Sequence, residues 1–363
     1  MKRSRPHLGS RNSPASRPVH ATCIFFPSPL YPKNCRSLGE PAASWPDSVG
    51  SFSGIGSRWQ SPNFPIQVKM DLHTSLENSL RQTSAIVYCA IDTLVPSRGK
   101  PAPGLATVAG FADFSIALAH AGIPSIWITS RTRAQMDEPL RKLDHAHPFI
   151  AEGGSAVYLP TDYFHLRGEK SERRGRFLCI PVAQPQPAAA EALESLSEET
   201  GVAVVPLRSL SPRELAQNSG LPQREAELAR QRDFDELFFF AGASDRDIKR
   251  LLEEARRRKF RLRPQGVLWS LALGASVPEC IRQLTKLFDR ALHGHAPTIG
   301  LAPREQADEL FPACDRNILL VAESEESNNE TVVRPPSGSR VREISLHAPE
   351  AWEEVLAQII KKN

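Results

Sequence analysis

The sequence predicts an α/β fold built on a parallel sheet. Short, predominantly apolar segments alternate with segments whose apolar residues recur at helical spacing. Such short apolar segments suit strands that are buried on both faces. The chain also has 363 residues, 40% of them hydrophobic, which is enough for a sizeable core and for more than one domain.

The first part of the chain supplies the clearest alternation. The first expected strand ends at Asp92, and the helix after it stops at Gly122, a typical residue at a helix C-terminus. The expected strands lie at 86–91, 125–129, 149–151 and 156–159, and the expected helices at 105–119 and 134–143. This order implies right-handed crossovers, so the carboxyl ends of the parallel strands meet at one edge, where ligands bind in such sheets.

The stretch 166–265 differs from its surroundings and is expected to form an α+β insertion, a separate lobe. It combines expected strands at 177–181, 202–207 and 238–240 with expected helices at 188–199, 212–217, 222–232 and 245–259. The alternating pattern then returns, with helices at 278–292, 304–311 and 349–361 and strands at 298–301, 318–322 and 343–346. The polar stretch 323–338 is expected to be a flexible loop.

The first 69 residues have a composition unlike the rest. They contain 10 Pro, 12 Ser and 5 Gly, and nine Lys or Arg against two acidic residues, which leaves the remainder mildly acidic. Such a segment buries too little apolar surface to offset the entropy of ordering, so 1–83 is expected to be a disordered tail. Two alternatives are a targeting segment and a segment that is not translated, with Met70 as the true start.

Composition also limits the compartment and the partners. The six cysteines are scattered and form no C-x-x-C pair, which fits a reducing compartment and predicts a cytoplasmic protein without a disulfide scaffold. No apolar run reaches the roughly 18 residues that a membrane span needs. Most of the basic tail lacks interleaved aromatic residues. Neither a membrane nor a nucleic acid is therefore expected as a partner, and no protein partner is indicated.

Polar residues follow two neighbouring strands of the predicted sheet. Asp92 comes directly after the first strand, and Thr129, Ser130 and Arg131 end the second. A helix that begins at Ser130 would direct its backbone N–H groups outward, where an anion is favoured. Arg131 adds a planar set of donors that suits phosphate or carboxylate. The alternative is that Ser130 only caps the helix and that Arg131 is solvated.

Histidine pairs and one cysteine are further candidates. His145 and His147, like His293 and His295, would suit a metal on one face of a strand, but they follow helices, where C-terminal histidines complement the helix dipole. Cys89 lies in the first strand, where alternation turns its side chain away from the face of the next residue. We therefore expect helix-end histidines and a core cysteine.

Four segments, in chain order, resemble one known family. They are 128–135 (ITSRTRAQ), 148–157 (PFIAEGGSAV), 229–238 (ARQRDFDELF) and 349–352 (PEAW). They are similar to the TSKTRAE, PFIVENGAAI, AKEREFDEPF and GPEGW segments of mannosyl-3-phosphoglycerate phosphatases, members of the haloacid dehalogenase (HAD) superfamily. The likeness spans about 84–362.

This resemblance implies a fold and an activity. The fold would be a HAD-like Rossmannoid parallel sheet in two parts, 84–165 and 266–363, with a C2B-type cap at 166–265. The family hydrolyses the phosphate monoester of mannosyl-3-phosphoglycerate to give mannosylglycerate. An Asp at the end of the first strand attacks phosphorus, and a second Asp two residues later acts as acid and base. Mg²⁺ is held by the nucleophile and by carboxylates of a late loop, and a Lys screens the phosphoryl charge.

The essential positions are changed in this chain. The nucleophile position is Ala90, whereas Asp92 matches the second Asp. In the late loop, Pro303 and Ala307 replace the carboxylates and Gln306 replaces an Asn. A methyl group cannot attack phosphorus, and the loss of a nucleophile costs on the order of 10⁶ in turnover in a serine protease. Mg²⁺ sites in proteins usually contain one or two carboxylates, so Mg²⁺ binding is expected to be weak or absent.

The resulting expectation is a pseudoenzyme that binds a phosphorylated sugar or a glycerate-like anion with little turnover. Alternatives are an active HAD-type phosphatase that uses Asp92 in an altered site, and a structural paralogue without a ligand. The expected phosphate-binding residues are Thr129, Ser130 and Arg131. The expected substrate and cap residues are Glu152, Gly153, Arg230, Arg232 and Glu236.

Overall fold

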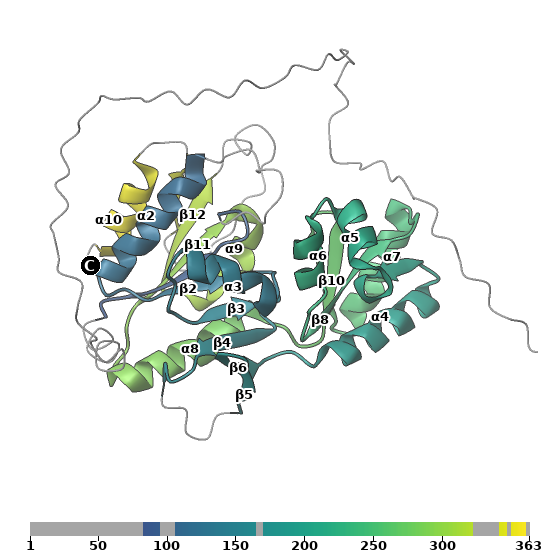
Figure 1. Cartoon of the computed structure of the whole chain (residues 1–363), viewed down its shortest axis with the longest axis horizontal. Helices are drawn as coiled ribbons and strands as arrows, with labels where there is room; N and C mark the ends of the chain where they lie inside the picture. Colours follow the sequence, from purple (N-terminus) through teal and green to yellow (C-terminus); the bar gives the residue numbers. More distant parts are fainter. Residues whose placement is uncertain (1–82, 95–105, 165–169, 322–340, 347–349, 361–363) are drawn as a thin grey trace, which may run out of the picture. The chain divides into compact units, whose positions relative to one another are not determined.

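The computed structural model describes residues 83–94, 106–164, 170–321, 341–346 and 350–360 (Figure 1). The chain divides into two units, Met1–Ile66 and Gln67–Asn363, and every described residue belongs to the second. The predicted disordered tail, the alternative start at Met70 and the predicted loop at 323–338 lie outside the described residues. Within these ranges, no helix is long and apolar enough to cross a membrane.

In the described part of the chain, nine strands form one large sheet. Their spatial order is β13 (Val341–Ser345), β12 (Arg316–Val321), β11 (Thr298–Pro303), β1 (Ile86–Ala90), β2 (Ser125–Ile128), β3 (Phe149–Ala151), β4 (Ala156–Pro160), β6 (Phe177–Pro181) and β5 (Glu172–Arg174). Neighbours from β13 to β3 pair in parallel, and β4, β6 and β5 continue the sheet antiparallel. Every residue of β1, β2 and β3 is buried, as expected for strands covered on both faces.

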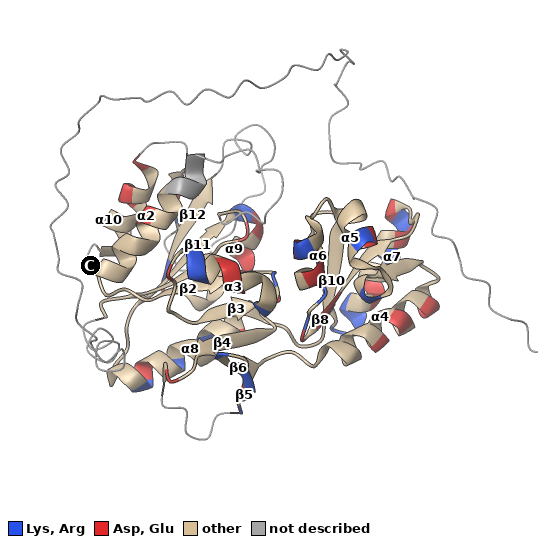
Figure 2. Cartoon of the chain, in the orientation of Figure 1, with Lys and Arg blue, Asp and Glu red and all other residues tan. Residues whose placement is uncertain are grey.

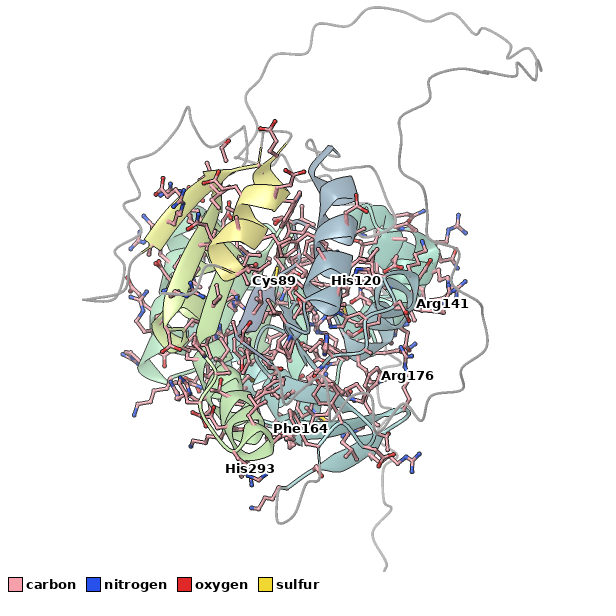
Figure 3. All side chains as sticks on the ribbon, turned by 90° about the vertical axis from the view of Figure 1, so that its left-hand side faces the viewer. Cys89, His120, Arg141, Phe164, Arg176 and His293 are labelled. Atoms are coloured by element: carbon pink, nitrogen blue, oxygen red, sulfur yellow. The ribbon has the colours of Figure 1, made fainter. Side chains whose placement is uncertain are left out.

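Helices cover both faces of this sheet (Figure 1). One face carries α2 (Ala106–His120), α3 (Arg133–Lys142) and α10 (Ala351–Ile360), and the other carries α8 (Val277–Leu292), α9 (Arg304–Leu310) and the 3₁₀ turn η2 (Phe311–Ala313). Alternation along β1 places Cys89 in the first apolar core and Ala90 in the second. The expected core position of Cys89 is confirmed, and its side chain lies among packed neighbours (Figure 3).

A second, antiparallel sheet contains four strands of the described chain. Its order is β7 (Val204–Pro206), β8 (Asp235–Phe240), β10 (Leu268–Ala272) and β9 (Arg261–Gln265). One apolar cluster joins it to α4 (Gln186–Thr200) and α7 (Asp245–Arg257), and another joins it to η1 (Leu207–Ser209), α5 (Pro212–Ser219) and α6 (Gln223–Ala229). Acidic side chains follow one another along α4, and α7 carries both signs of charge (Figure 2). The first turn of α7 is acidic and its last turn basic, which complements the helix dipole.

The mixed α/β architecture with a large parallel sheet is confirmed, but the second sheet differs from the predicted lobe at both ends. The predicted lobe, 166–265, includes β5 and β6, which pair in the large sheet, and it omits β10, which pairs with β8. An apolar run predicts a buried strand without indicating its neighbour, so periodicity alone does not place such a strand in one sheet or the other. The domain boundaries at 84–165 and 266–363 stay predictions.

The helix expected at 134–143 is α3, Arg133–Lys142, and Ser130 neither starts nor caps it. Thr132 is the N-cap, and its hydroxyl accepts a hydrogen bond from the Gln135 N–H at 3.1 Å. The Gln135 side chain accepts from the Thr132 N–H at 3.1 Å, which completes a capping box. Ser130 therefore lies in the loop between β2 and α3, with its N–H 2.8 Å from Asp92 Oδ2.

His145 and His147 pack against the large sheet. The His145 ring stacks on Trp127, with the ring centroids 3.8 Å apart, and His147 Nδ1 lies 2.8 Å from the hydroxyl of Tyr163. Burial lowers the pKa of His145, and it lowers the pKa of His147 to about 4. Both rings are neutral at pH 7, so the interpretation of this pair as cations that complement a helix dipole is wrong.

Acidification is expected to destabilise the fold through this pair. Unfolded histidines, with a pKa of about 6.5, bind protons that the folded pair does not, so the contribution is complete above about pH 6.5 and is lost as the pH falls toward 4. Both side chains keep some solvent contact, so we expect the free energy of unfolding to fall by about 1–2 kcal/mol between pH 7 and pH 5. Urea unfolding at the two pH values measures this loss.

Two variants separate this pair from the other histidines. His147→Gln should reduce the loss of stability, whereas His120→Gln, which changes an exposed histidine (Figure 3), should retain it. The same pH dependence in both variants would contradict the assignment.

Candidate functional site

A cavity of about 740 Å³ lies beside the carboxyl end of β1. Its wall is formed by the loops after β1 and β2, by α9, and by residues of α6 and the second sheet. The charged residues on this wall are Asp92, Arg131, Arg232, Arg263, Glu305 and Glu309. The cavity therefore lies at the edge of the sheet where the strand order predicts a ligand.

Asp92 is held by donors from two other elements. Its Oδ1 accepts a hydrogen bond from the Thr129 hydroxyl, and its Oδ2 accepts from the Ser130 N–H at 2.8 Å and from Gln306 Nε2 at 3.3 Å. The Thr129 hydroxyl oxygen in turn accepts from the Arg131 N–H at 3.1 Å. The structure thus brings Asp92, Thr129 and Ser130 together. The donors that were expected to face a ligand anion engage an internal carboxylate.

Arg131 places a cation on the cavity wall in a largely dry position. The residue is 8% exposed and lines the cavity. Burial lowers the pKa of Arg131, and the carboxylates of Asp92 and Glu225 act against that shift. Arginine nevertheless stays protonated. A buried guanidinium group interacts more strongly with an incoming anion than an exposed guanidinium group does, because water screens it less.

Glu152 connects the large sheet to the second sheet. This residue, 2% exposed, sits in the β3–β4 turn, and its carboxylate accepts hydrogen bonds from three backbone N–H groups: Asp233 at 2.9 Å, Phe234 at 2.9 Å and Asp235 at 3.1 Å. Burial and the Asp235 carboxylate raise the pKa of Glu152, and the guanidinium of Arg232 opposes them. Glu152 is not among the described residues that line the cavity, so the structure gives it a connecting position.

Gly153, the next residue of the turn, makes the second connection. Its carbonyl accepts from Arg261 Nη1 at 2.9 Å and from Arg263 Nη1 at 3.1 Å. Its φ is +62°, and a Cβ at this position would lie 2.2 Å from Arg263 Nη1. A side chain at this position would be strained by the positive φ and would require the guanidinium of Arg263 to move.

Arg232 lies on the cavity wall and links the two sheets as well. Its guanidinium donates to the carboxylate of Asp235 and, at 2.8 Å, to the carbonyl of Ser130. The side chains of Arg232 and Asp235 are 5% and 1% exposed. A buried pair with such contacts orients the loop that carries Ser130 and leaves the guanidinium charge balanced.

The other two predicted residues of this region lie away from the cavity. Arg230 is exposed and donates to the carbonyl of Arg208 at 3.4 Å. Glu236 is buried and accepts from the side-chain amide of Gln186, and burial raises its pKa. Neither belongs to the cavity wall as the described residues define it.

The positions that match the family's Mg²⁺ ligands carry apolar residues. Ala90 and Ala307 belong to one buried apolar cluster, and Pro303 is buried at the end of β11. Among the residues described, no group of three or more His, Cys, Asp or Glu side chains is placed to hold a metal ion. Mg²⁺ is bound through carboxylate and other oxygen ligands, so the donor set at these positions does not fit the ion.

The prediction missed a cluster on β9 and α9. Arg261 and Arg263 both pair with Glu309 on α9, Arg261 at 2.5 Å, and Arg263 and Glu309 line the cavity. Burial lowers the pKa of Arg263, and Glu309 acts against the shift more strongly than Asp92. A signal was present in the sequence, because charged and apolar residues alternate from Arg261 toward a turn at Gly266, the pattern of a hairpin strand.

Comparison with known proteins finds distant relatives. No family model matches the chain. It is 23% identical over 241 residues to a glucosyl-3-phosphoglycerate/mannosyl-3-phosphoglycerate phosphatase of Methanococcoides burtonii, an alignment that covers 66% of this chain and 86% of the relative. A phosphatase of the same name from Persephonella marina is 26% identical over 203 residues, which covers 55% and 72%. The chain is a distant relative of the mannosyl-3-phosphoglycerate phosphatases.

The predicted resemblance to the mannosyl-3-phosphoglycerate phosphatases is therefore confirmed. A solved phosphatase of the HAD superfamily from Bacteroides thetaiotaomicron aligns with a TM-score of 0.46 and 12% identity, over 80% of this chain and 97% of that chain. A haloacid dehalogenase-like hydrolase from the same organism aligns with a TM-score of 0.44 and 10% identity, over 66% and 88%.

Proposed function

We propose that this relative of the mannosyl-3-phosphoglycerate phosphatases binds a small phosphorylated organic anion in the cavity and turns it over slowly or not at all. One observation carries the proposal. Ala90, at the tip of β1, is 1% exposed, and its methyl group packs among apolar side chains. A covalent phosphoryl intermediate needs a nucleophile, and the side chain here has none. Weak or absent Mg²⁺ binding belongs to the same proposal.

The ligand class follows from the wall of the cavity. Arg131 and Arg263 both line the cavity and supply positive charge, one from the loop after β2 and one from β9. Guanidinium groups bind phosphate and carboxylate with paired hydrogen bonds. We infer a phosphorylated sugar or a glycerate-like anion, and the ligands to test first are mannosyl- and glucosyl-3-phosphoglycerate. We also propose that the second sheet and its helices act as a C2B-type cap, in a cytoplasmic protein.

A working phosphatase that uses Asp92 is the second candidate. It is supported by the position of Asp92, whose partly exposed carboxylate lines the cavity. In that case phosphate release from mannosyl-3-phosphoglycerate would be abolished in Asp92→Asn. Binding without release, in the presence or absence of Mg²⁺, supports the first proposal.

Arg131→Ala is expected to weaken ligand binding about ten- to a hundredfold, because hydrogen bonds to a charged group contribute about 1.5–3 kcal/mol. Isothermal titration of mannosyl-3-phosphoglycerate into the purified full chain measures the affinity, and the ligand-induced rise in melting temperature provides a second readout. Arg230→Ala is the matched control, since Arg230 is exposed and lies away from the cavity. Equal affinities in the two variants would refute the assigned binding site.

A further inference from the structure

We propose that Asp92 is an internal anion, which occupies the Thr129 and Ser130 donors and competes with the ligand for them. This inference rests on the proposed function, because it states how the binding site is occupied before a ligand arrives. It gives Asp92 a role other than acid and base catalysis. The ligand group that it would compete with is a phosphate or a carboxylate.

The geometry fixes the direction of these hydrogen bonds. The Thr129 hydroxyl oxygen accepts from the Arg131 N–H at 3.1 Å, and its own proton is donated to Asp92 Oδ1. The Ser130 N–H points to Asp92 Oδ2 at 2.8 Å. A hydroxyl and a backbone N–H that converge on one carboxylate form the kind of donor set that binds an anion. Here that anion belongs to the chain itself.

The partners of Asp92 differ from those of the other carboxylates near the cavity. Glu309 pairs with Arg261 and Arg263, and Asp235 pairs with Arg232. The hydrogen bonds that hold Asp92 come from neutral groups, namely a hydroxyl, a backbone N–H and the Gln306 amide at 3.3 Å, and the charges of Arg131 and Arg263 also act on it. Because the donors themselves are neutral they can take another anion, and a ligand anion would then balance the same two guanidinium groups.

The cavity gives a ligand access to part of this donor set. Asp92, Ser130 and Gln306 all line the cavity, whereas Thr129 is 1% exposed behind Asp92, so a ligand phosphate meets the Ser130 side of the donor set first. Two anions at one donor pair repel each other, and the ligand has to displace the carboxylate or bind beside it. Removal of the Asp92 carboxylate should therefore strengthen anion binding, whereas removal of a general acid and base would not.

Asp92→Ala is the decisive variant, and inorganic phosphate is the probe. Titration calorimetry on the full chain should show binding at least about tenfold tighter in Asp92→Ala than in the unchanged chain, which corresponds to about 1.4 kcal/mol. Glu305→Gln is the charge control, because it removes a negative charge from the same wall and leaves the donors engaged. Its effect should be clearly smaller. Asp92→Asn serves if Asp92→Ala does not fold, as judged by circular dichroism.

The outcomes separate this inference from the proposed function. Tighter phosphate binding in Asp92→Ala supports the inference, even if the unchanged chain binds no phosphorylated sugar and the proposed function fails. Equal or weaker phosphate binding in Asp92→Ala or Asp92→Asn overturns the inference, even if the unchanged chain binds the sugar ligand. An increase of the same size in Glu305→Gln also overturns it, because the effect would then come from net charge.

Discussion

Replacement of Glu152 by alanine is expected to lower the free energy of unfolding by about 3–5 kcal/mol. The carboxylate accepts hydrogen bonds from three consecutive backbone N–H groups, 233–235, and a buried N–H without a partner costs about 1–3 kcal/mol. The nearby guanidinium of Arg232 would lose a negative neighbour as well. Urea unfolding at pH 7, followed by circular dichroism, measures the change.

The control for this variant is Glu227→Ala, which changes an exposed glutamate on α6 and should cost less than about 0.5 kcal/mol. Glu152→Gln should fall between the two, because its amide oxygen still accepts while its NH₂ group meets the same N–H donors. Equal stability of Glu152→Ala and Glu227→Ala would show that water replaces the carboxylate at no cost.

The same contact bears on the cavity. Glu152 holds the segment that begins β8, and Arg232 in that region donates to the carbonyl of Ser130. The loop that carries Ser130 also supplies the donors to Asp92. Removal of the Glu152 carboxylate should therefore weaken the contact between the two sheets and also the position of the loop that carries Ser130. The free energy of unfolding and the ligand affinity of Glu152→Ala are expected to fall together.

Much of the fold follows from local patterns in the sequence. Predominantly apolar runs predict β1 and β2, because strands covered by helices on both faces have no solvent side. The start of α3 was also encoded, since Thr132 and Gln135 have the spacing of a capping box, although Ser130 was considered as the cap. The pairing of β6 with β4 was not encoded locally, because an apolar strand fits either sheet.

The site was predictable only in part. Strand order places Asp92 and Ser130 at one edge of the sheet, and the structure joins them by a hydrogen bond. The strand order does not reveal that the Ser130 N–H donates to a carboxylate of the same chain, since that hydrogen bond depends on how the two loops pack. Glu152 likewise has no sequence signal for its partners, which lie about 80 residues further along the chain. Contacts of such separation are set by tertiary packing.

Ala90→Asp is expected to destabilise the fold by about 3 kcal/mol or more at pH 7. Ala90 is 1% exposed and packs in the same apolar cluster as Ala307, so a carboxylate at this position would be buried among apolar side chains. Burial of an unpaired charge is among the largest single-residue costs. Thermal and urea unfolding measure the change. Ala90→Asn is the uncharged control and should cost less.

A second carboxylate, at position 303, tests whether position 90 lies close to the end of β11. Pro303 is buried but occupies the N-cap of α9, where an aspartate can accept from helix N–H groups, so Pro303→Asp alone should cost less than Ala90→Asp. β1 and β11 pair in parallel and end at the same edge of the sheet. In the double variant, Mg²⁺ is expected to restore part of the stability that Ala90→Asp loses, because the ion would neutralise both carboxylates. Equal stability with and without Mg²⁺ would show that the two positions do not converge, and phosphate release on addition of Mg²⁺ would show that they still form the edge of a catalytic site.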